Sequence, residues 1–125
     1  MNDKGLSLLE TLVSMLILSF GILGMAPLFV LSIESNSMSQ DVMTVSNLAK
    51  ETIEFYQTSD SLPGLPYDQT EYAIDGTYDR QILIWDNTTD TTITDGLCHI
   101  QVIITWTDNV GVSRSAPYKS ILDKG

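Results

Sequence analysis

The feature that most constrains this chain is a run of 23 uncharged residues from Thr11 to Ile33, bracketed by Glu10 and Glu34. About 20 predominantly apolar residues suffice to cross the hydrocarbon core of a bilayer as a helix. A buried helix of a soluble protein is seldom apolar on every face, and a chain of 125 residues has little core with which to cover one. The run therefore predicts a transmembrane helix.

A secretory signal peptide is the alternative explanation for an apolar run near the N-terminus. Such a peptide has a basic start, a shorter apolar stretch and a cleavage site of small residues after it. In this chain Asp3 offsets Lys4, the run is too long, and its last third contains Pro27 and Phe29. We therefore expect no cleavage beyond Ile33.

The residues just before the run carry a second signal. Lys4 and Gly5 are followed by Leu6, three further residues and then Glu10. Glycine presents no side chain to a protease and leaves a helix at little cost. A carboxylate at the edge of an apolar helix costs about 2.5–3.5 kcal/mol on insertion scales, so such a group usually has a partner. The alternative for Glu10 is an interfacial acid that favours the positive end of the helix dipole.

This arrangement resembles the class III signal of type IV prepilins. The resemblance implies that a prepilin peptidase cuts between Gly5 and Leu6 and methylates the new amine of Leu6. It divides the chain into a leader, a transmembrane and filament-core helix, and an extracytoplasmic part. These are residues 1–5, 6–33 and 34–125.

The resemblance also assigns roles inside the helix. Glu10 would meet the N-terminal amine of a neighbouring subunit during assembly. Gly21, Gly24 and Pro27 would mark where the helix melts when the subunit enters a filament, because a proline in a helix interior removes one hydrogen bond and crowds the preceding turn. The alternative is that transmembrane helices tolerate glycine and proline without further consequence.

Beyond Glu34 the apolar residues recur at spacings of three and four, which predicts an amphipathic helix. The apolar stripe consists of Met38, Val42, Val45, Ala49, Ile53 and Tyr56. The breaker-rich stretch 59–66 ends the helix. An unbroken helix from Leu6 to Gln57 would be about 75 Å long, which suits the lollipop outline of a pilin.

The C-terminal half changes to a period of two, which is typical of strands. The predicted strands are Glu71–Ile74, Gln81–Trp85, Cys98–Trp106 and Val112–Ile121. The stretch 108–111 predicts a hairpin loop, and Pro117 places the last strand at a sheet edge. The expected fold is α+β, with one long N-terminal helix on a small antiparallel sheet of about three to four strands.

Composition excludes several classes of function. Acidic residues outnumber basic ones 16 to 6, giving a net charge of -10, so we expect no nucleic-acid partner. With one histidine and one cysteine, no catalytic arrangement, disulfide, metal site or cofactor is predicted, and we expect no enzyme. We expect Cys98 to be a buried thiol and His99 a surface residue. The stretch 86–95 is expected to be a solvated loop, with a calcium site as the alternative.

The sequence most resembles PilV-type minor pilins, which implies a subunit that helps to initiate pilus assembly, with a possible role in adhesion. The I-type minor pseudopilin of a type II secretion system is an alternative, and a single-pass anchored binding module is another. The expected partners are prepilin peptidase, other pilin or pseudopilin subunits, and inner-membrane lipid before assembly. Lys4 before the span and the acidic excess after it predict a cytoplasmic N-terminus and an extracytoplasmic head.

Overall fold

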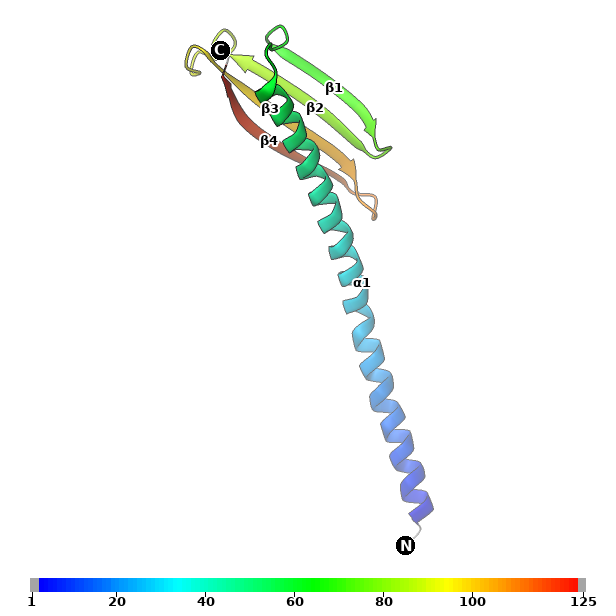
Figure 1. The fold of residues 1–125 in the computed structure, drawn as a ribbon. Helices are drawn as coiled ribbons and strands as arrows, with labels where there is room; N and C mark the ends of the chain where they lie inside the picture. The colour runs from blue at the N-terminus through cyan, green and yellow to red at the C-terminus, as the bar shows by residue number, and fades with distance from the viewer. Residues whose placement is uncertain (1–2, 124–125) are drawn as a thin grey trace. The chain divides into compact units, whose positions relative to one another are not determined.

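The computed structural model describes residues 3–123. Its elements are α1 (Asp3–Thr58), β1 (Tyr67–Ile74), β2 (Tyr78–Asp86), β3 (Leu97–Thr107) and β4 (Ser113–Asp123) (Figure 1). The predicted α+β class with a small antiparallel sheet is confirmed, with four strands. Met1 and Asn2, which belong to the predicted leader, lie outside the described residues. The chain forms two compact units, residues 1–37 and residues 38–125.

The sheet of the second unit is an antiparallel meander in which strand order follows chain order, β1-β2-β3-β4. The predicted hairpin loop joins β3 to β4. The Asp108 carboxylate accepts hydrogen bonds from the backbone N–H groups of Val110 and Val112, at 3.1 and 2.8 Å. Gly111 has a φ of 84°, which a residue with a side chain rarely adopts. Pro117 lies in β4, which is an edge strand as predicted.

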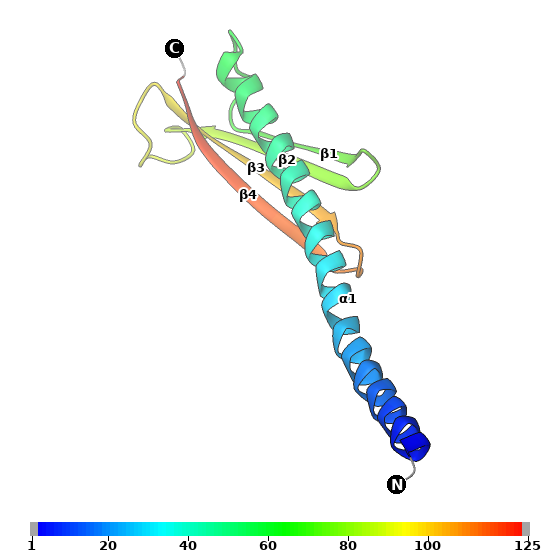
Figure 2. The same ribbon diagram turned by 60° about the horizontal axis from the view of Figure 1, so that its bottom comes forward.

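The second half of α1 covers one face of this sheet (Figure 2). Val45 and Ala49 are buried by inward-facing residues of the strands, because alternate strand residues point to opposite faces. The buried core consists of Val45, Ala49, Tyr78, Ile82, Ile84, Cys98, Ile100, Val102, Ile104, Trp106 and Leu122. Alternate residues of β3, from Cys98 to Trp106, all belong to this core.

The predicted helical stripe was wrong at its beginning. Met38 and Val42 are 49% and 45% exposed, whereas Val45 is fully buried. The hydroxyl of Tyr78, the first residue of β2, donates a hydrogen bond to Asp41 at 3.1 Å, so the sheet ends near this turn of the helix. Residues one turn earlier extend past the sheet and find no cover in the second unit.

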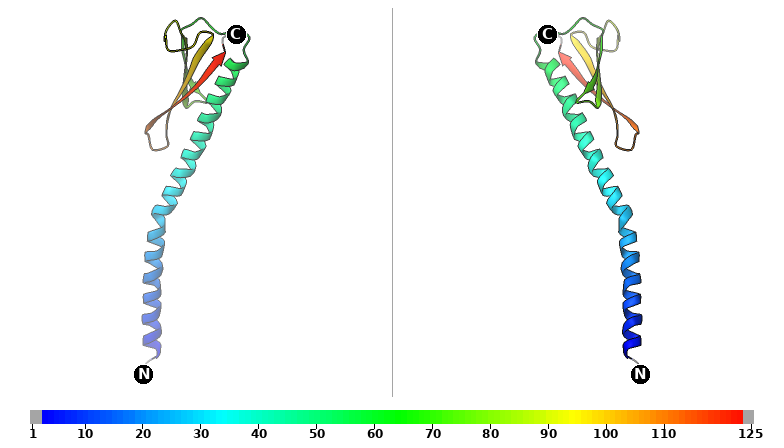
Figure 3. Two further views of the ribbon diagram at one scale, coloured as in Figure 1. Left: turned by 90° about the vertical axis from the view of Figure 1, so that its left-hand side faces the viewer. Right: turned by 90° about the vertical axis from the view of Figure 1, so that its right-hand side faces the viewer.

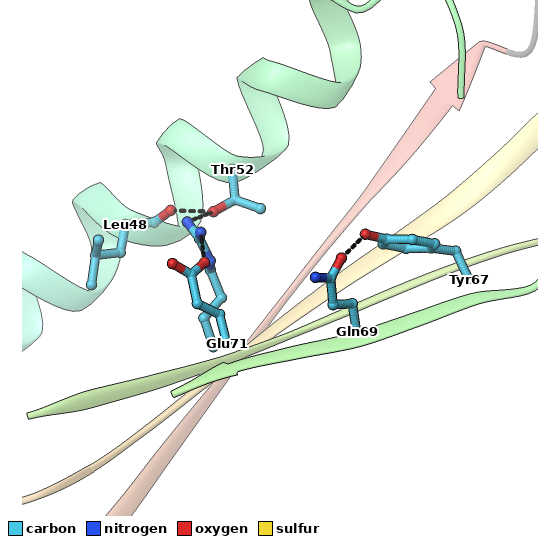
Figure 4. Close-up of polar contacts among 6 residues, drawn as sticks. Leu48, Thr52, Tyr67, Gln69 and Glu71 are labelled. Atoms are coloured by element: carbon cyan, nitrogen blue, oxygen red, sulfur yellow. Dashed lines mark hydrogen bonds and ion pairs between the residues drawn. The ribbon is translucent and has the colours of Figure 1, made fainter. Parts of the chain in front are cut away.

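A polar bridge joins the helix to two strands. Arg80 of β2 donates a hydrogen bond from Nη1 to the hydroxyl of Thr52 on α1 at 2.8 Å, and its Nη2 pairs with Glu71 of β1. Figure 4 labels Thr52 and Glu71, the two ends of this bridge. Thr52 is only 4% exposed and in turn donates to the carbonyl oxygen of Leu48 at 2.7 Å. The hydroxyl of Thr52 therefore both donates and accepts a hydrogen bond, and through Arg80 and Glu71 the bridge links β1 to the helix.

We expect Ile100→Ala to destabilise the sheet unit by about 3 kcal/mol, because it removes buried methyl groups and leaves a cavity in a packed core. Ile100 is 0% exposed. The free energy of unfolding can be followed by the fluorescence of the two tryptophans in a denaturant titration. Ile121→Ala is the matched control, since Ile121 is 57% exposed. Equal losses for the two variants would contradict the assigned core.

The stability of the same unit should fall as the pH rises from about 10 to about 12. Burial raises the pKa of Tyr56 from 10.0 to about 12, with a further contribution from neighbouring Tyr67. Above pH 10 the unfolded chain loses the proton of the Tyr56 hydroxyl while the folded chain keeps it. The free energy of unfolding therefore falls with rising pH until the pH passes the pKa of Tyr56 in the folded chain. Tyr56→Phe should flatten this part of a stability-against-pH curve; an unchanged curve would contradict the assignment.

Candidate processing and assembly segment

Gly5 and Leu6, the predicted processing site, lie in the first turns of α1. Nothing lies within 4 Å of the position that a Cβ on Gly5 would occupy, and the side chain of Leu6 is 49% exposed. The bond between them is thus open to an enzyme on the isolated chain. A protease that binds extended backbone has to unwind only this end of the helix.

Glu10, the predicted assembly residue, is exposed on the same helix. It follows Leu6 by four positions, so the two residues lie on one face about 6 Å apart along the axis. Among the residues that the structure describes, its carboxylate has no hydrogen-bond or ion-pair partner. An amine at Leu6 would therefore begin one turn from a carboxylate that needs a counter-charge.

The apolar segment that follows has no cover from its own chain. Its large side chains are 49–68% exposed from Leu6 to Ile33. The most apolar 18-residue window of α1 has a mean hydropathy of 2.3 and none of it is buried, so by length and composition the helix could cross a membrane. Such a surface needs lipid or other apolar helices around it.

Two hydroxyl groups within this segment are satisfied by the helix itself. Thr11 donates to the carbonyl oxygen of Ser7 at 2.9 Å, and Ser19 donates to that of Met15 at 2.7 Å. These bonds to the preceding turn leave neither hydroxyl unpaired in an apolar medium. The polar atoms of Thr11 and Ser19 are thus compatible with a lipid environment.

Gly21, Gly24 and Pro27, the predicted melting positions, all lie within the continuous helix. Pro27 has no N–H to donate, so the carbonyl oxygen of Leu23 lacks its usual partner one turn later. No atom lies within 4 Å of a Cβ built on either glycine. The three residues weaken the helix at one place, and its melting on entry into a filament stays a prediction.

The two residues with metal-binding or redox side chains fall on opposite faces of β3. Cys98 is fully buried in the core, as predicted. His99 faces away from the helix, as predicted, but it is half-buried, because its ring packs edge-on against Trp85 of β2 at a centroid distance of 5.8 Å. Between residues 3 and 123, no three His, Cys, Asp or Glu side chains are grouped so as to hold a metal ion.

The expectation of a wholly solvated loop over residues 86–95 was wrong in part. Asp86 closes β2 and is 2% exposed, and it accepts a hydrogen bond from the N–H of Thr88 at 3.1 Å. Ile93 is 5% exposed. The pKa of Asp90 lies below its usual value, mainly because the hydroxyl and N–H of Thr92 donate to its carboxylate. The segment is therefore a folded turn region held by aspartate–threonine pairs.

A hollow of about 510 Å³ lies near the end of α1, and no pattern in the sequence predicts it. Its walls come from the loop after the helix, from the end of β2 and from the end of β4. The acidic residues around it are Asp60, Asp86 and Asp123. These residues are far apart in the sequence, and no spacing motif connects them, so only the folded chain brings them together.

Residues 1–26 match the family described as the prokaryotic N-terminal methylation motif. No curated protein and no solved structure matches the chain. The match covers Gly5, Leu6 and Glu10 and ends one residue before Pro27. It supports a type IV pilin-like protein with a prepilin signal, and it agrees with the exposed apolar helix that the structure places there.

Proposed function

We propose that this chain is a structural subunit of a type IV pilin-like filament, made as a membrane-anchored precursor. The observation that carries the proposal is the methylation motif over residues 1–26 at the start of a 56-residue helix. The first half of that helix is exposed and apolar, and the second half packs on a sheet. One helix thus offers an anchor for lipid or filament and a support for a folded head.

The proposed sequence of events begins in the inner membrane, with the N-terminus in the cytoplasm and the sheet unit outside it. A prepilin peptidase removes residues 1–5 and methylates Leu6. Because charges attract strongly where the dielectric constant is low, the new amine and a Glu10 carboxylate of an adjacent subunit would pair as the helices come together. The weakened turn from Gly21 to Pro27 would then let the helix adapt to its neighbours.

Within this class we propose a minor subunit of the PilV type, which takes part in initiating assembly. The sequence similarity of Leu8–Val13 and the following glycines to that group supports the assignment, as does the single cysteine, since many major pilins close a C-terminal loop with a disulfide. The I-type minor pseudopilin of a type II secretion system is the second candidate. The genes beside this one distinguish the two, because minor pilus subunits tend to be encoded together.

The first prediction concerns processing. Co-expression with a prepilin peptidase should yield a chain that begins with N-methylated Leu6, and omission of the peptidase should leave Met1 in place. Mass spectrometry of the amino terminus measures both. Gly5→Val should block the cut by placing a branched side chain at the scissile bond, whereas Gly21→Val is the matched control and should be processed. A cut beyond Ile33 would instead support a secreted domain.

The second prediction concerns Glu10. Glu10→Gln keeps the size of the side chain but removes its charge, so the chain should be processed normally yet enter filaments at least tenfold less, as measured by immunoblot of sheared filaments against membranes. Glu34→Gln, which neutralises the acid at the other end of the apolar run, is the control. If both variants assemble like the native chain, a simple membrane anchor for a binding head becomes the better explanation.

A further inference from the structure

The face of the sheet opposite α1 is the surface of interest. Between residues 38 and 123, no helix or strand lies over the middle of it (Figure 3). The strand register sets its central rows, because residues paired across neighbouring strands point to the same face. One row reads Asp68, Leu83, Gln101 and Lys119, from β1 to β4. The rows beside it contain Trp85, His99 and Ile121, and Thr70, Gln81, Ile103 and Pro117.

This outer face is more apolar than a solvated sheet face needs to be. In an antiparallel sheet with one solvated face, apolar and polar residues normally alternate along each strand, and the polar residues point to the solvent. Here Leu83, Trp85 and Ile103 point outward and are half-buried only by their neighbours, while Ile121 is 57% exposed. The four side chains lie in neighbouring rows, so their accessible parts form one apolar region, and contiguous apolar regions are found at sites of association.

The three central rows of the outer face carry few charges, and the rows that flank them add Asp79 and Asp123. Residues 38–123 contain 13 acidic and 4 basic residues, so two such units repel each other in most orientations. The three central rows carry a single carboxylate, Asp68, and a single ammonium group, Lys119. Both side chains are exposed, and they stand at opposite ends of one row.

That row is complementary to itself. Consider two copies whose outer faces are stacked on each other and related by a two-fold axis that runs between the two sheets, parallel to the strands and midway between β2 and β3. This axis places β1 of one copy over β4 of the other, and each row lies over the same row of the second copy. Asp68 then faces Lys119 of the second copy twice, once at each edge. Packed sheets lie about 10 Å apart, a gap that a lysine and an aspartate side chain together can span. We propose that the outer face is an interface at which two copies of this chain pair, sheet against sheet.

The same axis suits two chains anchored in one membrane. It keeps the strand direction, so the Met38 ends of both units lie at the same end of the pair. Four strands about 4.8 Å apart and three rows about 7 Å apart offer about 800 Å² for the two copies together, which is the size of a weak interface. The pair is therefore weak in free solution and is favoured where anchoring raises the local concentration.

The test uses the full chain in liposomes, prepared as a mixture of ¹⁴N- and ¹⁵N-labelled protein and treated with a carbodiimide, which joins carboxylates to lysines without a spacer. Within one copy the two side chains sit three strand spacings apart, about 14 Å, which is too far for such a bond. We expect mass spectrometry to find the Asp68–Lys119 link between differently labelled copies. Absence of this link, or links only between residues of α1, overturns the proposal.

Charge reversal provides the second arm. Asp68→Lys alone and Lys119→Asp alone should each reduce this link at least fivefold, because each variant places like charges at both edges and leaves no carboxylate opposite a lysine; the double variant is therefore the decisive one. The double variant should restore it, with the link reversed. Glu51→Lys and Lys50→Asp, on the exposed side of α1, are matched controls and should change little. A double variant that fails to recover overturns the proposal, and none of these outcomes depends on N-terminal processing.

Discussion

The exposed apolar surface between Leu6 and Ile33 is the constraint that the rest of the chain has to satisfy. Each large apolar side chain is worth about 1.5–3 kcal/mol when it leaves water, and the whole of a small domain is stable by only about 5–15 kcal/mol. Lipid tails and apolar helices cover such a surface almost equally well. In the proposed filament subunit, the exchange of one for the other would be decided by the few groups along the helix that are not apolar or that lack a hydrogen bond, chiefly Glu10 and the turn at Pro27.

The two halves of α1 differ in their surroundings, and the difference follows from this constraint. From Leu6 to Ile33 the large apolar side chains of the first half are exposed, whereas the second half is held by packing at Val45 and Ala49 and by the Arg80–Thr52 bridge. A subunit that moves from lipid into a filament can therefore keep its folded head unchanged. The bridge matters for β1, which is an edge strand with mostly exposed residues, because the ion pair of Glu71 with Arg80 connects this strand to the helix.

Much of the fold could be predicted from the sequence, because the strongest signals were long and periodic. The 23 uncharged residues, the alternation from Cys98 to Trp106 and the turn at Asp108–Gly111 each specify one structure. The processing site could be proposed from Gly5 and Glu10 by resemblance alone. The position at which the helix begins to pack on the sheet could not be predicted from the sequence. Met38 has the spacing of a buried residue, and only the length of the sheet shows that no strand lies opposite Met38.

Other features depend on contacts between distant residues and left no local pattern. Asp86 looked like the first residue of a polar loop, yet it is buried where β2 ends. Arg80 and Thr52 are polar residues at positions that alternation and helical period assign to the core, and their pairing explains why both are tolerated there. The row from Asp68 to Lys119 likewise became visible only with the register of all four strands.

The meander has a kinetic consequence. Every strand pairs with the strand that immediately precedes or follows it, so most sheet contacts join residues close in sequence, and such topologies fold faster than those built on distant pairings. The sheet can therefore assemble stepwise, with each new strand adding to the edge formed by the strand before it.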